Sequence, residues 1–188
     1  MAIITIIGAG MMGSALAFPA RENGNEVRLV GTHLDAEIIE TCIRSNRHPK
    51  FTRDFPEGLE YYQIEELETA LEGADLVIGG VSSFGVEWFG EVILPKIPDG
   101  MPVLTVTKGL MDMPDGSLIC YPDYWQQKLD ALGKNVPLTA VGGPCTSYEL
   151  VAHDQTEVAF CGKDMAVLEK LRAIMETDYY HISLSTDV

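Results

Sequence analysis

The sequence has no closely spaced cysteines and little positive charge. Its cysteines, Cys42, Cys120, Cys145 and Cys161, stand far apart, and no histidine spacing completes a zinc pattern. Only 13 Lys and Arg residues stand against 28 Asp and Glu residues, giving a net charge of -15. Nucleic-acid binding needs a basic patch, which such a composition does not favour. We therefore expect no metal and no nucleic-acid partner, and we expect reduced thiols in the cytoplasm.

Long apolar runs are also missing. The first apolar run, Ile3 to Ile7, is stopped by Gly8, and no basic segment precedes it. Neither a signal peptide nor a membrane-spanning helix is expected from this pattern. An anionic ligand would need a local positive site against the negative field of the whole chain.

Short apolar runs alternate with helical patterns along the chain. We predict strands over 3–7, 26–30, 59–62, 76–80, 103–107, 138–141, 157–160 and 180–184. We predict helices over 11–23, 35–44, 64–71, 84–94, 123–132 and 165–175, and another after Pro144, with Asp35 as a helix cap. This order predicts one α/β domain over residues 1–188, with a doubly wound, mostly parallel Rossmann-type sheet and helices on both faces.

A glycine motif follows the first predicted strand directly. Gly8-Ala9-Gly10-Met11-Met12-Gly13 matches G-x-G-x-x-G and opens the first predicted helix, the context that a dinucleotide-binding fingerprint requires. Gly8 suits the tight turn, Gly10 the close approach of a pyrophosphate, and Gly13 the packing of helix on strand. The free N–H groups at the helix start attract the anion. The alternative is a strand–turn–helix that uses glycine only for its geometry.

The end of the second predicted strand bears on the choice of cofactor. A strictly NAD-dependent protein carries a carboxylate there, which binds the ribose hydroxyls. This strand ends in Gly31-Thr32-His33. We expect Thr32 and His33 to leave room for a 2′-phosphate, so that NAD or NADP is accepted; His33 can also be an ordinary loop residue.

Three more segments end predicted strands, where open α/β sheets bind ligands. They are Gly79-Gly80-Val81-Ser82-Ser83, Val106-Thr107-Lys108-Gly109-Leu110 and Gly142-Gly143-Pro144-Cys145. Together with the glycine motif they resemble the glycerol-3-phosphate dehydrogenase family. His48-Pro49-Lys50-Phe51 and Ser185-Thr186-Asp187-Val188 are similar to further stretches of that family, so the resemblance spans the chain.

The resemblance implies roles for particular residues. It implies a cofactor site made by Gly8, Gly10, Met11, Met12, Gly13, Thr32, His33, His48, Phe51, Val81, Ser82, Lys108 and Ser147. It implies that Lys108 contacts both substrate and nicotinamide, and that Gly143 and Cys145 contact substrate. A lysine at the end of a buried strand needs an anionic or polar partner. The alternative is a surface lysine paired with a carboxylate.

The resemblance also implies parts that lie beyond Val188. The family's proton-transferring lysine and most of its phosphate-binding groups belong to a second, helical domain. We therefore expect residues 1–188 alone to be inactive towards dihydroxyacetone phosphate, the family's small phosphorylated substrate, and a homodimer is possible. Cys145 stands where the family has Ser or Thr, and a thiol donates only weakly. A non-catalytic dinucleotide-binding module and another two-domain reductase, such as a ketopantoate reductase, are the alternatives.

Overall fold

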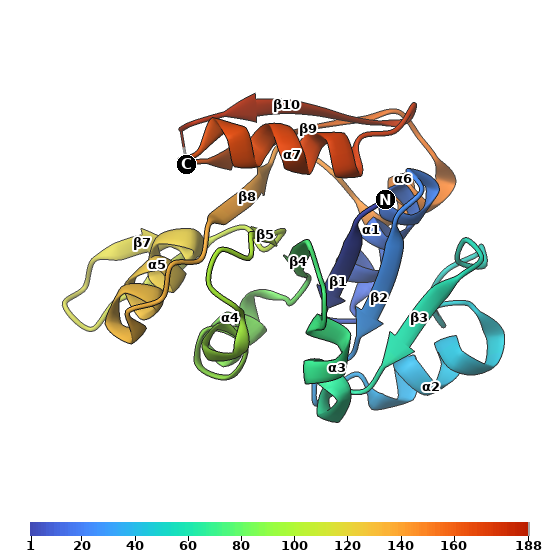
Figure 1. Ribbon diagram of the computed structural model, residues 1–188, viewed down its shortest axis with the longest axis horizontal. Coiled ribbons are helices and arrows are strands. Elements are labelled where there is room, and N and C mark those ends of the chain that lie inside the picture. The colour runs from blue at the N-terminus through green and yellow to red at the C-terminus, as the bar shows by residue number, and fades with distance from the viewer. Residues whose placement is uncertain (188) are drawn as a thin grey trace.

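An eight-stranded sheet runs through the structure, a computed structural model that describes residues 1–187 (Figure 1). Its strands are β1 (Ile3–Ile7), β2 (Glu26–Val30), β3 (Leu59–Tyr62), β4 (Leu76–Gly79), β5 (Val103–Thr105), β8 (Leu138–Gly142), β9 (Thr156–Gly162) and β10 (Tyr180–Ser185). Their order across the sheet is β10-β9-β8-β5-β4-β1-β2-β3. The run from β8 to β3 is parallel throughout, as the alternation of strands and helices predicts.

The central strand β1 is buried on both faces. It pairs with β2 on one side and β4 on the other, and Ile4, Ile6 and Ile7 are fully buried. Thr5 is also fully buried, and its hydroxyl donates to the carbonyl oxygen of Ala70 at 2.5 Å. This burial explains why β1 reads as a continuous apolar run rather than as an alternating one.

Helices cover both faces of the sheet, so the doubly wound prediction is confirmed. The helices α1 (Met11–Glu22), α2 (Ala36–Ser45), α6 (Ser147–Ala152) and α7 (Met165–Met175) contribute to one buried core. The helices α3 (Leu67–Leu71), α4 (Val86–Trp88) and α5 (Tyr121–Leu132) contribute to the other. Short 3-10 turns η1 (Ile64–Glu66), η2 (Ser83–Gly85) and η4 (Leu94–Lys96), with a π-helical stretch η3 (Phe89–Ile93), extend α3 and α4.

The direction of the last two strands departs from a fully parallel sheet. β9 runs antiparallel to β8, and β10 runs parallel to β9. The reason lies in the connection after β8, whose six-residue helix α6 is only about 9 Å long at 1.5 Å per residue. Such a short helix does not carry the chain back to the end of the sheet where β8 begins. The strand β9 therefore starts near the C-terminal end of β8 and runs in the opposite direction.

A small hairpin between β5 and α5 was not predicted. Its strands β6 (Leu110–Asp112) and β7 (Leu118–Cys120) pair antiparallel, and the hairpin projects at the left of Figure 1. The turn runs through Pro114-Asp115-Gly116, and Gly116 has φ +82°. A Pro-Asp-Gly stretch is a turn signal in the sequence. The predicted strand over 103–107 is correspondingly shorter in the structure.

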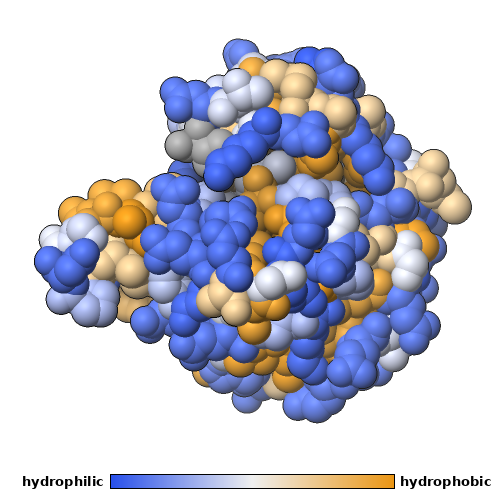
Figure 2. All heavy atoms as spheres, turned by 60° about the vertical axis from the view of Figure 1, so that its left-hand side comes forward, coloured by the Kyte–Doolittle hydropathy of each residue, from blue (hydrophilic) through white to orange (hydrophobic). Residues whose placement is uncertain are grey.

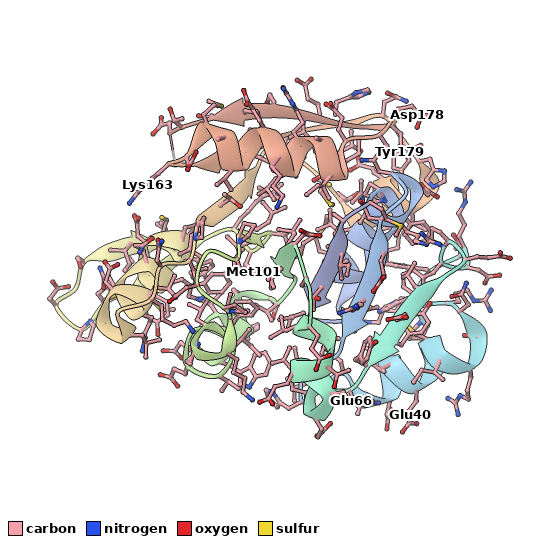
Figure 3. The ribbon with its side chains drawn as sticks, viewed as in Figure 1. Glu40, Glu66, Met101, Lys163, Asp178 and Tyr179 are labelled. Atoms are coloured by element: carbon pink, nitrogen blue, oxygen red, sulfur yellow. The ribbon has the colours of Figure 1, made fainter. Side chains whose placement is uncertain are left out.

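A polar contact fixes the start of β10 to α1 through Tyr179, which Figure 3 labels. The hydroxyl of Tyr179 donates to Glu22 at 2.5 Å, and its ring stacks on His153 with ring centroids 4.4 Å apart. His153 is the left-handed residue that ends α6, with φ +61°. His181 lies in β10 as predicted and contacts Gln155 at 2.8 Å.

Hydrophilic side chains cover most of the face that Figure 2 shows, with smaller apolar patches between them. Within residues 1–187, no helix combines the length and apolarity that crossing a bilayer requires.

Candidate dinucleotide-binding site

The loop between β1 and α1 forms a cradle for a ligand. Each glycine of the motif is suited to its position for a different physical reason. Gly8 has φ +113°, and a Cβ there would lie 2.8 Å from the carbonyl carbon of Gly80. A Cβ on Gly13 would meet the carbonyl oxygen of Gly8, so this glycine lets α1 pack closely. At Gly10 a Cβ would meet nothing within 4 Å. Gly10 therefore borders open space, as a residue that faces a ligand must.

The N-terminus of α1 faces the same space. Gly10 is the residue before the first turn, and no side chain caps that turn. The first backbone bond of the helix runs from the N–H of Ser14 to the carbonyl oxygen of Gly10 at 3.0 Å. The N–H groups of Met11, Met12 and Gly13 lie in the uncapped first turn, where the helix dipole favours an anion. The side chains of Met11 and Met12 are partly buried against the core, and their backbone N–H groups are the polar groups that this turn offers to an anion.

A pocket of about 350 Å³ opens beside the cradle. It is lined by Gly8, Gly10, Thr32, His33, Leu34, Asp35, Gly80, Val81, Ser82, Phe84, Gly85 and Trp88. Six of the predicted cofactor residues are among them, and Met11, Met12, Gly13, His48, Phe51, Lys108 and Ser147 are not. No lysine or arginine is found among these lining residues.

Aromatic side chains at the mouth of this pocket were not predicted from the sequence. Phe84 is 97 % exposed, and the rings of Trp88 and His33 lie 5.2 Å apart between centroids. Phe84 and Trp88 are four residues apart, which places them on one side of a helical segment. That spacing was the available signal. Exposed aromatic rings at a pocket mouth can stack on a purine base.

Asp35 lies where the sequence predicts a helix cap, but its carboxylate does not cap α2. Its Oδ2 atom accepts from the N–H of Thr32 at 2.9 Å, the hydroxyl of Thr32 at 2.8 Å and the N–H of Ala9 at 3.2 Å. The pocket therefore does contain a carboxylate near the end of β2, later in the chain than the usual position. The spacing Thr32-x-x-Asp35, in which a hydroxyl and a carboxylate bond locally, was the available signal.

The ends of β4, β5 and β8 are joined by side-chain hydrogen bonds. The hydroxyl of Thr107 donates to the carbonyl oxygen of Val81 at 2.5 Å. The Lys108 ammonium donates to the carbonyl oxygen of Gly143 at 2.7 Å. Within residues 1–187 no carboxylate lies within 4.0 Å of that ammonium, so the alternative of a carboxylate-paired lysine does not describe it. The Lys108 side chain is exposed at the carboxyl ends of these strands.

The segment after β8 contains the helix predicted after Pro144, which is α6 and begins at Ser147. Thr146 caps α6 through its hydroxyl, and the Glu149 carboxylate accepts from both the N–H and the hydroxyl of Thr146. A carboxylate thus occupies this helix start. Burial raises the pKa of the Cys145 thiol to about 11, against a weaker lowering by Lys108. That thiol packs against the core, and Ser147 is buried.

His48 and Phe51 lie behind the glycine loop. His48 is 1 % exposed, its Nε2 atom lies 3.1 Å from the carbonyl oxygen of Ala9, and its ring centroid lies 4.6 Å from that of Phe51. Burial is the largest effect on His48 and lowers its pKa. The structure therefore brings His48 to the cradle through the backbone of Ala9, with no face open to the pocket.

A mostly parallel α/β sheet with this cradle, pocket and strand-end crevice defines a Rossmann-type dinucleotide-binding domain. Comparison with known proteins then identifies the family. Residues 3–168 match the family described as the NAD-dependent glycerol-3-phosphate dehydrogenase N-terminus, and the chain belongs to it.

Relatives and solved structures agree with this family. The chain is 37 % identical over 187 residues to an NADP(+)-dependent glycerol-3-phosphate dehydrogenase of Archaeoglobus fulgidus, covering 99 % of the chain and 54 % of the relative. It is 31 % identical to an Escherichia coli glycerol-3-phosphate dehydrogenase [NAD(P)+], covering 93 % and 49 %. The fold matches the Coxiella burnetii glycerol-3-phosphate dehydrogenase with a TM-score of 0.84 at 22 % identity, covering 100 % and 55 %. The chain spans about half the length of the curated relatives it matches.

Proposed function

We propose that the protein is an NAD(P)-dependent glycerol-3-phosphate dehydrogenase, with residues 1–188 as its NAD(P)-binding domain. The reaction interconverts dihydroxyacetone phosphate and sn-glycerol 3-phosphate. The observation that carries the proposal is the Lys108–Gly143 contact, which holds an exposed ammonium where β5 and β8 end. The family match adds the substrate class.

The residues of the cradle and pocket fit a dinucleotide. Backbone N–H groups at Gly10, Met11, Met12 and Gly13 would bind its pyrophosphate, since no side chain caps that turn. The pocket that includes Thr32, His33 and the aromatic rings would bind the adenosine end. Val81, Ser82 and Lys108 end the neighbouring strands and would border the nicotinamide. When bound, the nicotinamide donates or accepts the hydride.

The chain's own contribution to the chemistry is electrostatic. Reduction of a ketone develops negative charge on its oxygen, and a cation held at that point stabilises the charge. The Gly143 carbonyl holds the Lys108 ammonium at the crevice without neutralising it. Cys145 would serve through its backbone N–H alone, because its thiol is packed inward and protonated. The contacts predicted for Phe51 and Ser147 stay predictions, whereas His48 would act through the backbone of Ala9.

The remaining parts of the reaction belong to the proposal as well. We infer that a second domain supplies the proton-transferring lysine and the phosphate clamp, and that the protein acts in the cytoplasm, where its four free cysteines stay reduced. A homodimer stays a prediction.

The test is an oxidation assay on the gene's full product. NADH and NADPH oxidation should follow addition of dihydroxyacetone phosphate and not of ketopantoate. Turnover of ketopantoate alone would assign the protein to another reductase. Cofactor binding without turnover of either ketone would favour the non-catalytic module.

A further inference from the structure

Both backbone polar groups of Ala9, which lies between Gly8 and Gly10 in the glycine loop, have hydrogen-bond partners. Its N–H donates to the Oδ2 atom of Asp35 at 3.2 Å, and its carbonyl oxygen lies 3.1 Å from Nε2 of His48. These two groups belong to consecutive peptide planes, 8–9 and 9–10. Ala9 itself is fully buried, so water does not compete for either bond.

The geometry of a peptide links these bonds to the ligand side of the loop. A trans peptide is planar, and its C=O and N–H point in opposite directions. A bond that fixes the Ala9 carbonyl towards His48 therefore directs the Gly10 N–H the opposite way. Gly10 lines the pocket, and within the described part of the chain its N–H has no hydrogen-bond partner. The N–H left free is the one that an anion in the cradle would meet.

The tautomer of His48 follows from its second contact. Its Nδ1 atom accepts from the N–H of Lys50 at 3.2 Å, so Nδ1 carries no proton. A neutral imidazole then carries its proton on Nε2, which makes His48 the donor to Ala9. Because His48 is 1 % exposed, it can act on a ligand only through the loop.

We infer that His48 and Asp35 are positioning residues, which together clamp the Ala9 peptide groups so that the Gly10 N–H is presented to the cofactor pyrophosphate. This inference rests on the proposed function, because it assumes a dinucleotide in the cradle. His48 thereby gains a role that differs from direct contact with the cofactor. Asp35 gains one that its place before α2 does not suggest.

The test compares two ligands on the gene's full product. NADH carries the pyrophosphate, whereas adenosine occupies only the far end of the pocket. His48→Met removes the donor at similar volume, and we expect it to weaken NADH binding by about tenfold, the loss of one well-formed bond. Adenosine binding should stay within about twofold of the original. His48→Gln keeps a terminal N–H donor and should recover most of the NADH affinity.

Phe55→Leu is the matched packing control. Phe55 is 3 % exposed, and its ring centroid lies 6.1 Å from that of Phe51, in the cluster that surrounds His48. Within residues 1–187 no hydrogen bond joins Phe55 to Ala9, so Phe55→Leu should lower the melting temperature and leave the NADH dissociation constant unchanged. A purely structural role for His48 would give His48→Met the same behaviour as this control, and that result overturns the inference.

Asp35→Ala tests the other side of the clamp. Both residues act on one loop, so the double variant should weaken NADH binding by less than the product of the two single effects. Independent, multiplicative effects contradict a shared clamp. If His48→Met does not fold, Asp35→Ala and His48→Gln carry the test. Failure of the unmodified protein to bind NADH would instead overturn the proposed function, and this inference with it.

Discussion

The Lys108 ammonium donates to the carbonyl oxygen of Gly143 at 2.7 Å, which joins the end of β5 to the end of β8. The family resemblance implied a substrate contact for Lys108 and another for Gly143, which lies in a segment 35 residues away. A carbonyl oxygen orients an ammonium and leaves its charge available. The contact thus provides a positioned cation at the crevice where the parallel strands end.

Removing this cation should reduce catalysis more than cofactor binding. We expect Lys108→Ala in the gene's full product to lower kcat by about 10²–10³, as loss of one group that stabilises developing charge does. The dissociation constant of NADPH should change far less, which fluorescence titration measures. Lys108→Arg keeps the charge but not the ammonium geometry, and should recover only part of kcat. An unchanged kcat in Lys108→Ala would remove this residue from the chemistry.

The motif glycines should separate into binding and folding effects. Gly10→Val places a side chain in open space, so the protein should fold and lose dinucleotide binding because the cradle is filled. Gly13→Ala is the contrasting variant, since its Cβ meets the backbone of Gly8. We expect it to destabilise the fold by about 1–3 kcal/mol, the usual cost of overpacking. Calorimetric titration and thermal melts measure the two effects. A folded Gly10→Val protein with full affinity would contradict the cradle assignment.

The sheet could be predicted because each strand carries its own signal. The buried run of β1, the glycine loop and α1 follow one another in the sequence, and local patterns settle them. The direction of β9 could not be predicted, because it depends on how far α6 carries the chain. The hairpin at Leu110–Asp112 and Leu118–Cys120 did carry a turn signal at Asp115-Gly116, which its short strands obscured.

The site was harder to predict where roles depend on distant contacts. Asp35 reads as a cap from its place before α2, yet its carboxylate binds Thr32 and Ala9. His48 is buried behind the loop, a fact that no local pattern states. Gly31 is close to Ile39, where a Cβ would lie 2.7 Å from Cγ1, so an acidic residue cannot be introduced there without strain. Such relationships arise only when β1, β2 and the 46–58 loop pack together.

The carboxylate of Asp35 should influence the choice between cofactors. No lysine or arginine lines the described pocket, so a 2′-phosphate would meet this negative charge without a lining cation. Asp35→Asn keeps an oxygen acceptor and removes the charge. We expect the ratio of NADPH to NADH affinity to rise by roughly fivefold, from about 1 kcal/mol of repulsion at water-exposed separations. Parallel titrations of both cofactors measure this ratio. A ratio that stays constant or falls would mean that Asp35 does not face the 2′ position.

Acidification should destabilise the protein through His48. Burial lowers its pKa below the ordinary value of 6.5, with a smaller lowering by Lys50 and raising effects from the Ala9 bond and Asp35. The unfolded chain therefore binds more protons between the lowered pKa and 6.5, so this contribution is complete above 6.5 and is lost as the pH falls through that window. The slope from one proton is at most about 1.4 kcal/mol per pH unit. Denaturant unfolding of the original protein and of His48→Gln at several pH values isolates the contribution of His48. Parallel pH profiles of the two free energies of unfolding would rule that contribution out.

The last prediction concerns a polypeptide of residues 1–188 on its own. We expect it to bind NADH or NADPH, because the cradle and pocket are built from its own strands and loops. We expect no useful turnover of dihydroxyacetone phosphate. A positioned acid must protonate the forming alkoxide, which contributes about 10²–10⁴ in rate. Fixing the ketone against the nicotinamide contributes more, on the order of 7–11 kcal/mol in favourable cases.

Lys108 can polarise the ketone, but it is one group on one side of an open crevice. The chain spans 54 % of its Archaeoglobus fulgidus relative, and the family resemblance assigns the acid and the phosphate clamp to the remaining part. NADPH oxidation should therefore be compared among residues 1–188, the same polypeptide with Lys108→Ala, and the gene's full product. Robust turnover by residues 1–188 that disappears in Lys108→Ala would show that one domain suffices. The catalytic acid would then have to be sought among the residues at the ends of β4, β5 and β8.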